Sequence, residues 1–428
     1  MPGHKGSGDP ETYDITEIPG ADDLSDPSGI IAESERNAGM IFGARTFYSC
    51  EGSSLCVRAM LYLVMLTAKE SGRRPFVISP RNAHKSFLTA CGLLDIDVGW
   101  IYPSRTDREW YLSGGFGTED VRAALESNPG CTAVYITSPD YLGNMADIPS
   151  IAALCREHGA LLAVDNAHGA YLRFFGKHPI SLGADMCCDS AHKTLPVLTG
   201  GAYLHISGSA PGILKRSARQ ALGMFSTTSP SYLILQSLDA ANRIMSSAGF
   251  SERIRKMAES VSEAREGLRA LGLVPERTGM EEYLKLTLRP KSFGYTGTEL
   301  SEVLRKQGIV CEFSDPDCCV MMFSPSNSLT DPGRLLKAVR HTGSRKPVSG
   351  APCGFSVPRR TMSLHDAMTS PFETLPADNN IIGRIMAFPS LSCPPAVSVA
   401  VPGETVDEFV LSCMKYYSIK KSDVITKI

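Results

Sequence analysis

The sequence lacks the features that mark membrane, secreted and nucleic-acid-binding proteins. No stretch approaches the roughly 20 apolar residues that a membrane-spanning helix needs. Residues 1–14 are polar and rich in glycine and proline, so they do not form the apolar core of a signal peptide. The formal net charge is −2, whereas proteins that bind nucleic acids usually carry a basic surplus. These absences predict a soluble cytoplasmic protein with no membrane or nucleic-acid partner.

Motifs for metal and nucleotide binding are also missing. The chain has 13 cysteines but no C-x-x-C, and the adjacent pairs Cys187–Cys188 and Cys318–Cys319 are awkwardly spaced for chelating a metal. We therefore expect free thiols that act as small hydrophobic side chains, and no metal site. The sequence has no G-x-x-x-x-G-K-[ST], and no G-x-G-x-x-G follows its first strand. Neither a P-loop nor a dinucleotide-binding domain is indicated.

Short apolar runs alternate with helical patterns through the first half of the chain. Strands are expected at residues 75–79, 97–103, 132–139, 161–165, 184–188 and 200–207, and helices at 30–42, 55–69, 83–92, 119–127 and 148–158. Ser28 is the expected cap of the first helix. Strands separated by helices of about ten residues form right-handed crossovers. The pattern therefore predicts an α/β protein with a mainly parallel central sheet flanked by helices.

The second half is organised differently. Residues 232–271 are expected to form one or two long helices, followed by strands at 284–288, 309–313 and 318–323 and helices at 298–307 and 331–340. A connector rich in proline, glycine, serine and basic residues leads to a last segment. We predict an N-terminal arm at 1–28, a large domain at 29–240, a small α+β domain at 241–345, and a connector with a C-terminal segment at 346–428.

An acid and a lysine stand just beyond two of the predicted strands. Asp165 ends the run at 161–165, and Lys193 follows the run at 184–188. Ligands of open α/β sheets bind beyond the carboxyl ends of the strands. A lysine that forms a Schiff base, with a carboxylate that keeps a pyridine nitrogen protonated, is what a pyridoxal phosphate site needs. The commoner role of a lysine at such a place is a solvated surface charge.

The surroundings of three histidine–lysine pairs favour one of them. Lys5 lies in the predicted arm, and Lys85 opens a predicted helix. Only Lys193 combines a buried approach strand with an upstream acid at a comparable strand end. Ser190 and His192, just before it, carry groups suited to a phosphate.

Further polar groups extend this site hypothesis. Gly52, Ser53 and Ser54 stand at the start of a predicted helix, where free amides and the helix dipole favour an anion. His84 follows a strand and could stack on a cofactor ring, and His168 lies three residues after Asp165. Each of these features is more often structural, as a helix cap or a buried histidine.

The motifs resemble those of a known family, in its order and over most of the chain. The chain resembles the ornithine/lysine/arginine decarboxylases, which are pyridoxal-phosphate-dependent enzymes of the aspartate-aminotransferase fold (type I), in a short form without the N-terminal wing domain. The segments that carry the resemblance are PGHK, DITEIPGADDLSDPSGII, FGARTFYSCEGSS, RNAHKS, VDNAHGA, GAD, DSAHKTLPVLTGGAYLH, GRIMA and CPPAVSVAVPGE.

The resemblance implies a role for each site residue. Lys193 would be the Schiff-base lysine, Asp165 the partner of the pyridine nitrogen, and His84 the residue stacked on the ring. His168 would lie beside the ring oxygen or the substrate. The phosphate would be held by Gly52, Ser53, Ser54, Ser190 and His192. The resemblance also implies a homodimer or higher oligomer with active sites at the interface, near the N-terminal arm.

Four segments depart from the family pattern. Residues 51–54 read EGSS in place of N-G-S-T, and residues 139–143 read PDYLG in place of P-T-Y-Y-G. Residues 165–168 read DNAH in place of D-E-A-H, and residues 393–398 read CPPAVS in place of Y-P-P-G-I-P. The residues expected to hold the cofactor are kept, while the loops expected to face the substrate have changed.

The implied reaction is decarboxylation of arginine, ornithine or lysine through a quinonoid intermediate, with Lys193 or His84 as the general acid. A basic substrate needs an acidic partner for its distal cation, for which Asp140, Glu373 and Glu404 are speculative candidates. Each is more commonly a solvated surface carboxylate.

Two other classes of function stay open. One is a different pyridoxal reaction, namely transamination, elimination or cyclisation of an arginine-like substrate. A transaminase would need a carboxylate clamp such as Arg359, Arg360 or Arg384. The other is a homologue that binds the cofactor without catalysis.

Overall fold

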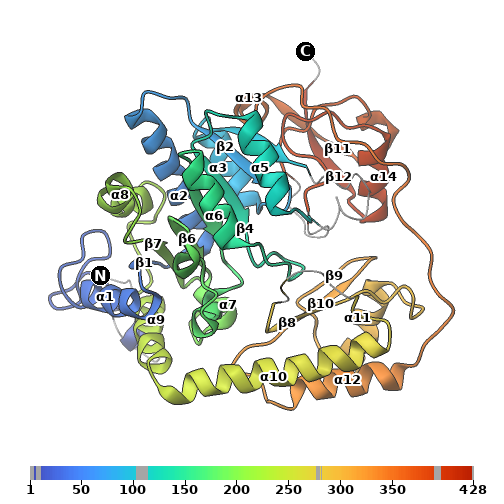
Figure 1. The fold of residues 1–428 in the computed structure, drawn as a ribbon, viewed down its shortest axis with the longest axis horizontal. Helices are drawn as coiled ribbons and strands as arrows, with labels where there is room; N and C mark the ends of the chain where they lie inside the picture. Colours follow the sequence, from blue (N-terminus) through green and yellow to red (C-terminus); the bar gives the residue numbers. More distant parts are fainter. Residues whose placement is uncertain are drawn as a thin grey trace. The chain divides into compact units, whose positions relative to one another are not determined.

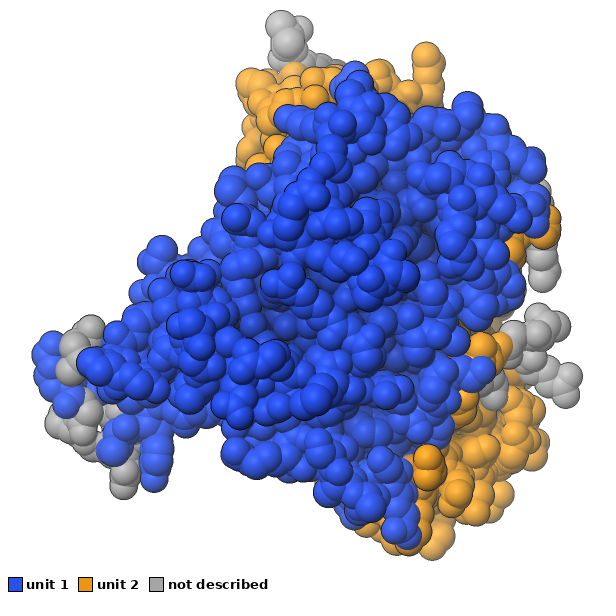
Figure 2. Space-filling view, turned by 60° about the vertical axis from the view of Figure 1, so that its left-hand side comes forward, with its two compact units in different colours: residues 1–78, 122–138, 147–254 blue, residues 79–121, 139–146, 255–428 orange. Residues whose placement is uncertain are grey.

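A computed structural model of the chain describes residues 4–5, 11–102, 114–275, 280, 282–389 and 397–426 (Figure 1). The chain divides into two compact units (Figure 2). Unit 1 comprises Met1–Ile78, Arg122–Ser138 and Asp147–Ile254, and unit 2 comprises Ser79–Val121, Pro139–Ala146 and Arg255–Ile428. The four domains predicted from the sequence stay a prediction. Among the described helices, none is long and apolar enough to cross a membrane.

A seven-stranded sheet has the order β1-β7-β6-β5-β4-β2-β3. The strands are β1 (Arg45–Ser49), β2 (Phe76–Pro80), β3 (Asp97–Ile101), β4 (Ala133–Thr137), β5 (Leu161–Asp165), β6 (Met186–Asp189) and β7 (Ala202–Ile206). The pairs β2–β4, β4–β5 and β5–β6 are parallel, whereas β7 is antiparallel to both β6 and β1. The predicted α/β fold with a mainly parallel sheet is therefore confirmed. Every residue of β4, β5 and β6 is buried, as expected for parallel strands covered on both faces.

The helices of the first 270 residues agree broadly with the predicted pattern. They are α1 (Ile30–Phe42), α2 (Gly52–Glu70), α3 (Lys85–Leu93), α5 (Thr118–Ser127), α6 (Ile148–Glu157), α7 (Ala191–Thr194), α8 (Gly212–Gly223), α9 (Tyr232–Met245) and α10 (Ala248–Ala270), with 3-10 turns η1 (Glu11–Tyr13), η2 (Ala170–Phe175) and η3 (Pro179–Leu182). The apolar face of α2 packs against β5, β6 and β7 and against α8. Helix α8 was not predicted.

The cap of α1 comes from the N-terminal arm. The Oδ2 atom of Asp22 accepts hydrogen bonds from the N–H groups of Gly29 (2.8 Å) and Ile31 (2.9 Å). The N-cap residue of α1 is Gly29 and not Ser28, so the predicted cap is wrong. Tyr232 donates its hydroxyl to the carbonyl of Asp22 (2.6 Å), which ties the arm to α9.

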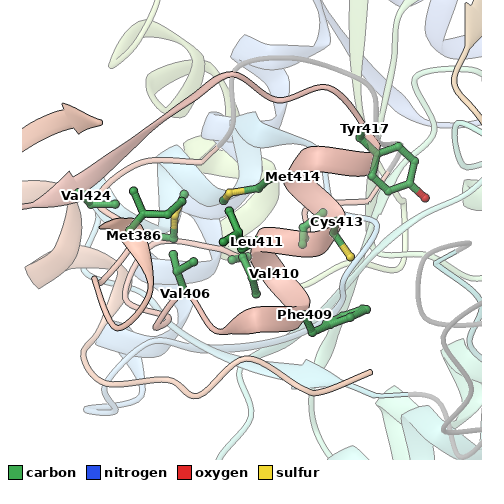
Figure 3. Packing of buried hydrophobic residues seen from close by; sticks show 12 residues of the cluster. Met386, Val406, Phe409, Val410, Leu411, Cys413, Met414, Tyr417 and Val424 are labelled. Carbon is green, nitrogen blue, oxygen red and sulfur yellow. The ribbon is translucent and has the colours of Figure 1, made fainter. Parts of the chain in front are cut away.

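Two smaller sheets lie in unit 2. The antiparallel order β8-β10-β9 joins β8 (Lys285–Leu288), β10 (Cys319–Met322) and β9 (Phe313–Ser314), accompanied by α11 (Gly297–Lys306) and α12 (Asp331–Thr342). Near the C-terminus, β11 (Phe372–Pro376) pairs with β12 (Lys421–Ile425), together with α13 (Leu364–Thr369), η4 (Asn379–Ile381) and α14 (Glu408–Tyr416). Side chains of α14 pack around Met386, Val406 and Val424 (Figure 3). The C-terminal segment thus has an apolar cluster of its own.

Candidate active site

The strand directions of unit 1 bring several predicted site residues to one edge of the sheet. Because β7 is antiparallel to both of its neighbours, β1 runs in the same direction as β6. The last residue of β1, Ser49, is opposite Ala202, and the last residue of β6, Asp189, is opposite Tyr203. The turn that starts α2 therefore lies at the same edge as the ends of β5 and β6.

The carboxylate of Asp165 is held in one orientation. Asp165 is 3% exposed at the end of β5. Its Oδ2 atom accepts a hydrogen bond from the hydroxyl of Tyr135 in β4 (3.0 Å). Its Oδ1 atom accepts from the N–H of Ala167 (3.1 Å) and lies 3.6 Å from the thiol of Cys188. A buried acid with donors on both oxygens is a preorganised partner for a cationic group.

Lys193 and His168 are brought together. The four-residue helix α7 follows β6 directly and carries the half-buried Lys193. Its Nζ atom lies 3.0 Å from Nε2 of His168, which is 4% exposed. The pair can therefore exchange a proton.

A polar cradle for an anion forms at the start of α2. The hydroxyl of Ser190 donates to the hydroxyl of Ser53 (2.7 Å), which joins α2 to the end of β6. Gly52 has a φ of +72°, a value that favours glycine, and its N–H donates to the carbonyl of Gly200 (2.7 Å). The first amides of a helix lack partners within the helix, so this end of α2 presents N–H groups, including that of Ser54, to an anion.

The neighbours of this cradle are held by backbone groups. Nδ1 of His192 lies 3.0 Å from the carbonyl of Gly201. The carboxylate of Glu51, where the sequence departs from the family pattern, accepts from the N–H of Thr227 (2.7 Å). The cradle, the lysine and the buried carboxylate fit the phosphate, the aldehyde and the ring nitrogen of pyridoxal phosphate, respectively.

His84 belongs to unit 2, where it caps α3. Its Nδ1 atom accepts from the N–H of Ser86 (3.2 Å) and lies 2.8 Å from that residue's hydroxyl. The imidazole is exposed. Its predicted stacking on the cofactor ring stays a prediction.

Asp140, a speculative substrate residue, is engaged by its own loop. It is 2% exposed, and its Oδ1 atom accepts from the N–H groups of Leu142 (3.0 Å) and Asn144 (2.8 Å). Its Oδ2 atom accepts from the side-chain amides of Asn144 (2.6 Å) and Asn82 (3.3 Å). Burial raises the pKa of Asp140, and these hydrogen bonds together with Lys285 offset part of that effect. The carboxylate therefore stabilises the loop after β4.

Glu404, the second speculative substrate residue, forms a buried bidentate pair. Its two carboxylate oxygens accept from the guanidinium of Arg81 at 2.7 and 3.0 Å, and both side chains are at most 2% exposed. Oε2 also accepts from the N–H of Val401 (2.8 Å), and the guanidinium lies 4.9 Å from the centre of the Trp100 ring. The pair joins the residues after β2 to the C-terminal segment.

Glu404→Gln should destabilise the protein, because it leaves the buried charge of Arg81 without a counter-ion. We expect a loss of about 3–5 kcal/mol in the free energy of unfolding, measured by urea titration. The control is Glu302→Gln, which breaks an exposed pair with Arg305 and should leave the urea midpoint unchanged. Unchanged stability of Glu404→Gln, with a raised KM for a basic substrate, would instead support the predicted substrate role.

Other charged residues from the sequence analysis also have partners. Glu373 accepts from Arg384 (2.6 Å), and Arg384 also donates to the carbonyl of Ile425 (2.5 Å). Arg360 pairs with Asp97 and donates to the carbonyl of Val98 (3.1 Å). The carbonyl of Arg359 accepts from the N–H of Thr405. The altered loop at Cys393 lies outside the described residues, except for its last two positions.

A set of buried polar residues beside the site was not predicted from the sequence. They are Tyr135, Asn166, His178, Asp189 and His205, each of which is 0% exposed. A tyrosine, an acid and a histidine inside apolar strands were the signal that could have found them, since buried polar side chains need partners. The twelve cysteines within the described part of the chain are free thiols, as expected.

A family model and curated relatives relate the chain to one group of decarboxylases. Residues 10–274 match the family model for "Orn/Lys/Arg decarboxylase, major domain". An arginine decarboxylase of Bacillus subtilis is 30% identical over 95% of this chain and 88% of its own length. An arginine decarboxylase of Halalkalibacterium halodurans is 30% identical over 97% of this chain and 89% of its own length.

Solved structures share the fold. The solved structure of lysine decarboxylase A from Pseudomonas aeruginosa matches the whole chain with a TM-score of 0.79, at 17% identity and over 78% of its own length. Structural neighbours are pyridoxal-dependent enzymes of fold type I, which confirms the predicted fold class. The chain therefore belongs to the Orn/Lys/Arg decarboxylase family of amino-acid decarboxylases, as its motifs predicted.

Proposed function

We propose that this protein uses pyridoxal phosphate to decarboxylate an amino acid of the arginine, ornithine or lysine class. The observation that carries the proposal is that Lys193, buried Asp165 and the Ser53–Ser190 pair all lie at the ends of β5 and β6 and the start of α2, within unit 1. The names of the curated relatives support a basic amino-acid substrate. Family membership supports the cofactor.

Each group of the site has a role in holding the cofactor. Lys193 would attach it covalently, and Asp165 would bind the ring nitrogen. Ser53, Ser190 and the first amides of α2 would hold the phosphate, assisted by the other predicted residues, Gly52, Ser54 and His192. When bound, pyridoxal phosphate withdraws electrons from the substrate Cα and so weakens its bond to the carboxylate. Asp165 strengthens that withdrawal, because a buried anion keeps the ring nitrogen protonated.

Lys193 and His168 would carry out the proton transfers of the reaction. Nζ of Lys193 reacts only as a neutral amine, and Nε2 of His168 at 3.0 Å can accept its proton. After CO₂ leaves, Nζ of Lys193 would return a proton to Cα as the general acid. His84, by the resemblance, stays the alternative acid and the proposed stacking residue.

The distal cation of the substrate needs a carboxylate partner. Asp140 and Glu404 remain proposals for that role, although both carboxylates already bind groups of unit 2. We also propose a homodimer or larger oligomer, which rests on the resemblance alone.

The reaction is tested by incubating the holoenzyme with arginine, ornithine and lysine and following CO₂ and products by mass spectrometry. We expect CO₂ release and an amine product from at least one of the three. Norvaline, which has the carbon chain of ornithine without its distal amine, is the matched control and should react poorly. Equal turnover of norvaline would contradict the basic substrate.

A second outcome would contradict decarboxylation itself. Products that keep the carboxylate and require an added keto acid would identify a transaminase. Products that keep the carboxylate without a keto acid would identify elimination or cyclisation. Neither result would affect the assignment of the cofactor.

A further inference from the structure

A buried hydrogen-bond network joins the two strand ends that carry Asp165 and Lys193. At its centre is Asp189, the last residue of β6. Its Oδ1 atom accepts from the side-chain amide of Asn166 (2.5 Å), and its Oδ2 atom accepts from Nε2 of His178 (3.0 Å) and of His205 (3.2 Å). Asn166, Asp189 and both histidines are 0% exposed.

The network is one residue away from the site on each strand. Asn166 directly follows Asp165, and its N–H donates to the carbonyl of Cys188 (2.9 Å). Asp189 directly precedes Ser190, whose hydroxyl contacts Ser53 at the anion cradle. The Asn166–Asp189 bond therefore sets how the Asp165 carboxylate lies relative to the turn that carries the lysine.

The network also reaches the strand that leads to the cradle. Nδ1 of His205 in β7 lies 2.8 Å from the hydroxyl of Thr46 in β1. With its Nε2 proton directed at Asp189, the neutral imidazole of His205 can accept a hydrogen bond from the Thr46 hydroxyl at Nδ1. Strand β1 ends three residues before Gly52, so one buried carboxylate links the segments that carry the lysine, the acid and the phosphate turn.

The charge distribution favours a neutral side chain at residue 166. A carboxylate at residue 166 would face the buried carboxylate of Asp189, and two like charges in a dry interior repel strongly. Burial by itself raises the pKa of Asp189, but His178 and His205 outweigh it and hold that pKa well below its usual range. Burial also lowers the pKa of His205, in keeping with a neutral imidazole.

We propose that Asp189, through its bond to Asn166, is a positioning residue that sets the Asp165 carboxylate relative to the lysine turn and the phosphate cradle. This inference rests on the proposed use of pyridoxal phosphate. Asp189 does not touch the cofactor in this scheme. It acts through Asn166 and through the turn that begins at Ser190.

The test compares wild type with Asn166→Asp, Asp189→Asn and the double variant. Asn166→Asp places two carboxylates together. We therefore expect a dissociation constant for pyridoxal phosphate that is at least tenfold larger, and an altered visible circular dichroism of the bound cofactor. In the double variant the donor and acceptor are exchanged at the same positions. We expect it to bind the cofactor more tightly than Asn166→Asp does.

A matched control separates positioning from stability. Asn242, also buried in unit 1, donates its amide to the carbonyl of Ser34 (3.0 Å) and the hydroxyl of Tyr48 (2.8 Å). Asn242→Asp should lower the midpoint of thermal unfolding and leave cofactor affinity and dichroism unchanged. If Asn166→Asp behaved in the same way, or if the double variant were no better than Asn166→Asp, the proposal would be overturned.

The test also addresses a metal at this place, because ligand atoms of His178, Asp189 and His205 lie within 4.8 Å of one another. We expect metal analysis of the purified protein to find none in stoichiometric amount. One equivalent of metal in the wild type that is lost in Asp189→Asn would overturn the hydrogen-bond account.

Failure of the proposed function can be told apart from failure of this inference, because the wild-type protein would then bind no pyridoxal phosphate. The coupling of Asn166 and Asp189 would still be measured from the midpoints of thermal unfolding of the wild type, the two single variants and the double variant. If the changes in midpoint of the single variants simply added up in the double variant, the coupling would be refuted.

Discussion

Replacing Lys193 by alanine is expected to remove covalent attachment of pyridoxal phosphate and to lower kcat by at least about a thousandfold. The Nζ atom beside His168 supplies both the attachment and the proton transfers of the proposed reaction, and removing such a nucleophile affects several steps at once. Borohydride reduction of the wild type should add the cofactor to the peptide that contains residue 193. The same treatment of Lys193→Ala should add it to no peptide.

The other two histidine–lysine pairs provide matched controls. Lys5 and Lys85 also follow a histidine directly, and both are exposed. Lys5→Ala and Lys85→Ala should keep the modified peptide and the activity. Attachment of the cofactor to another lysine in Lys193→Ala, together with retained turnover, would show that the assignment is wrong.

Asp165→Asn is expected to lower kcat by at least about a hundredfold while the protein remains folded. Asparagine has nearly the same shape, so the core around β5 keeps its packing. It is neutral, however, and it no longer stabilises a proton on the ring nitrogen, an electrostatic effect of the size seen when one preorganised group is removed. The measurement is kcat at saturating cofactor and substrate, with thermal unfolding as the check on structure.

Tyr135→Phe is a milder change at the same carboxylate. It removes one hydrogen bond to the Asp165 carboxylate and leaves the charge in place. The loss of one such bond corresponds to roughly a tenfold decrease in kcat. If Asp165→Asn kept kcat within about twofold of wild type, the carboxylate would have no role at the ring nitrogen.

Local patterns were sufficient for much of the fold. Helix α1 and strand β5 lie at the predicted residues, since an amphipathic period and a short apolar run are properties of neighbouring residues. Strand β6 begins later than predicted. It also ends later, at Asp189, because buried donors that no local pattern shows make a carboxylate acceptable there. Helix α8 was missed although its sequence carries a helical signal, since its buried residues Ile213, Leu214, Ala218, Ala221 and Leu222 recur at helical spacing.

The sequence by itself determined the family, the fold class and the residues proposed to hold the cofactor, because motifs such as DSAHKT and EGSS are contiguous. Only the tertiary structure decided which acids have partners. Asp140 and Glu404 are apparent surface carboxylates in the sequence, yet both are buried against groups that include Asn82 and Arg81. The bond from Asn166 to Asp189 likewise joins residues 23 positions apart. Such contacts follow from strand order and direction, which no local pattern specifies.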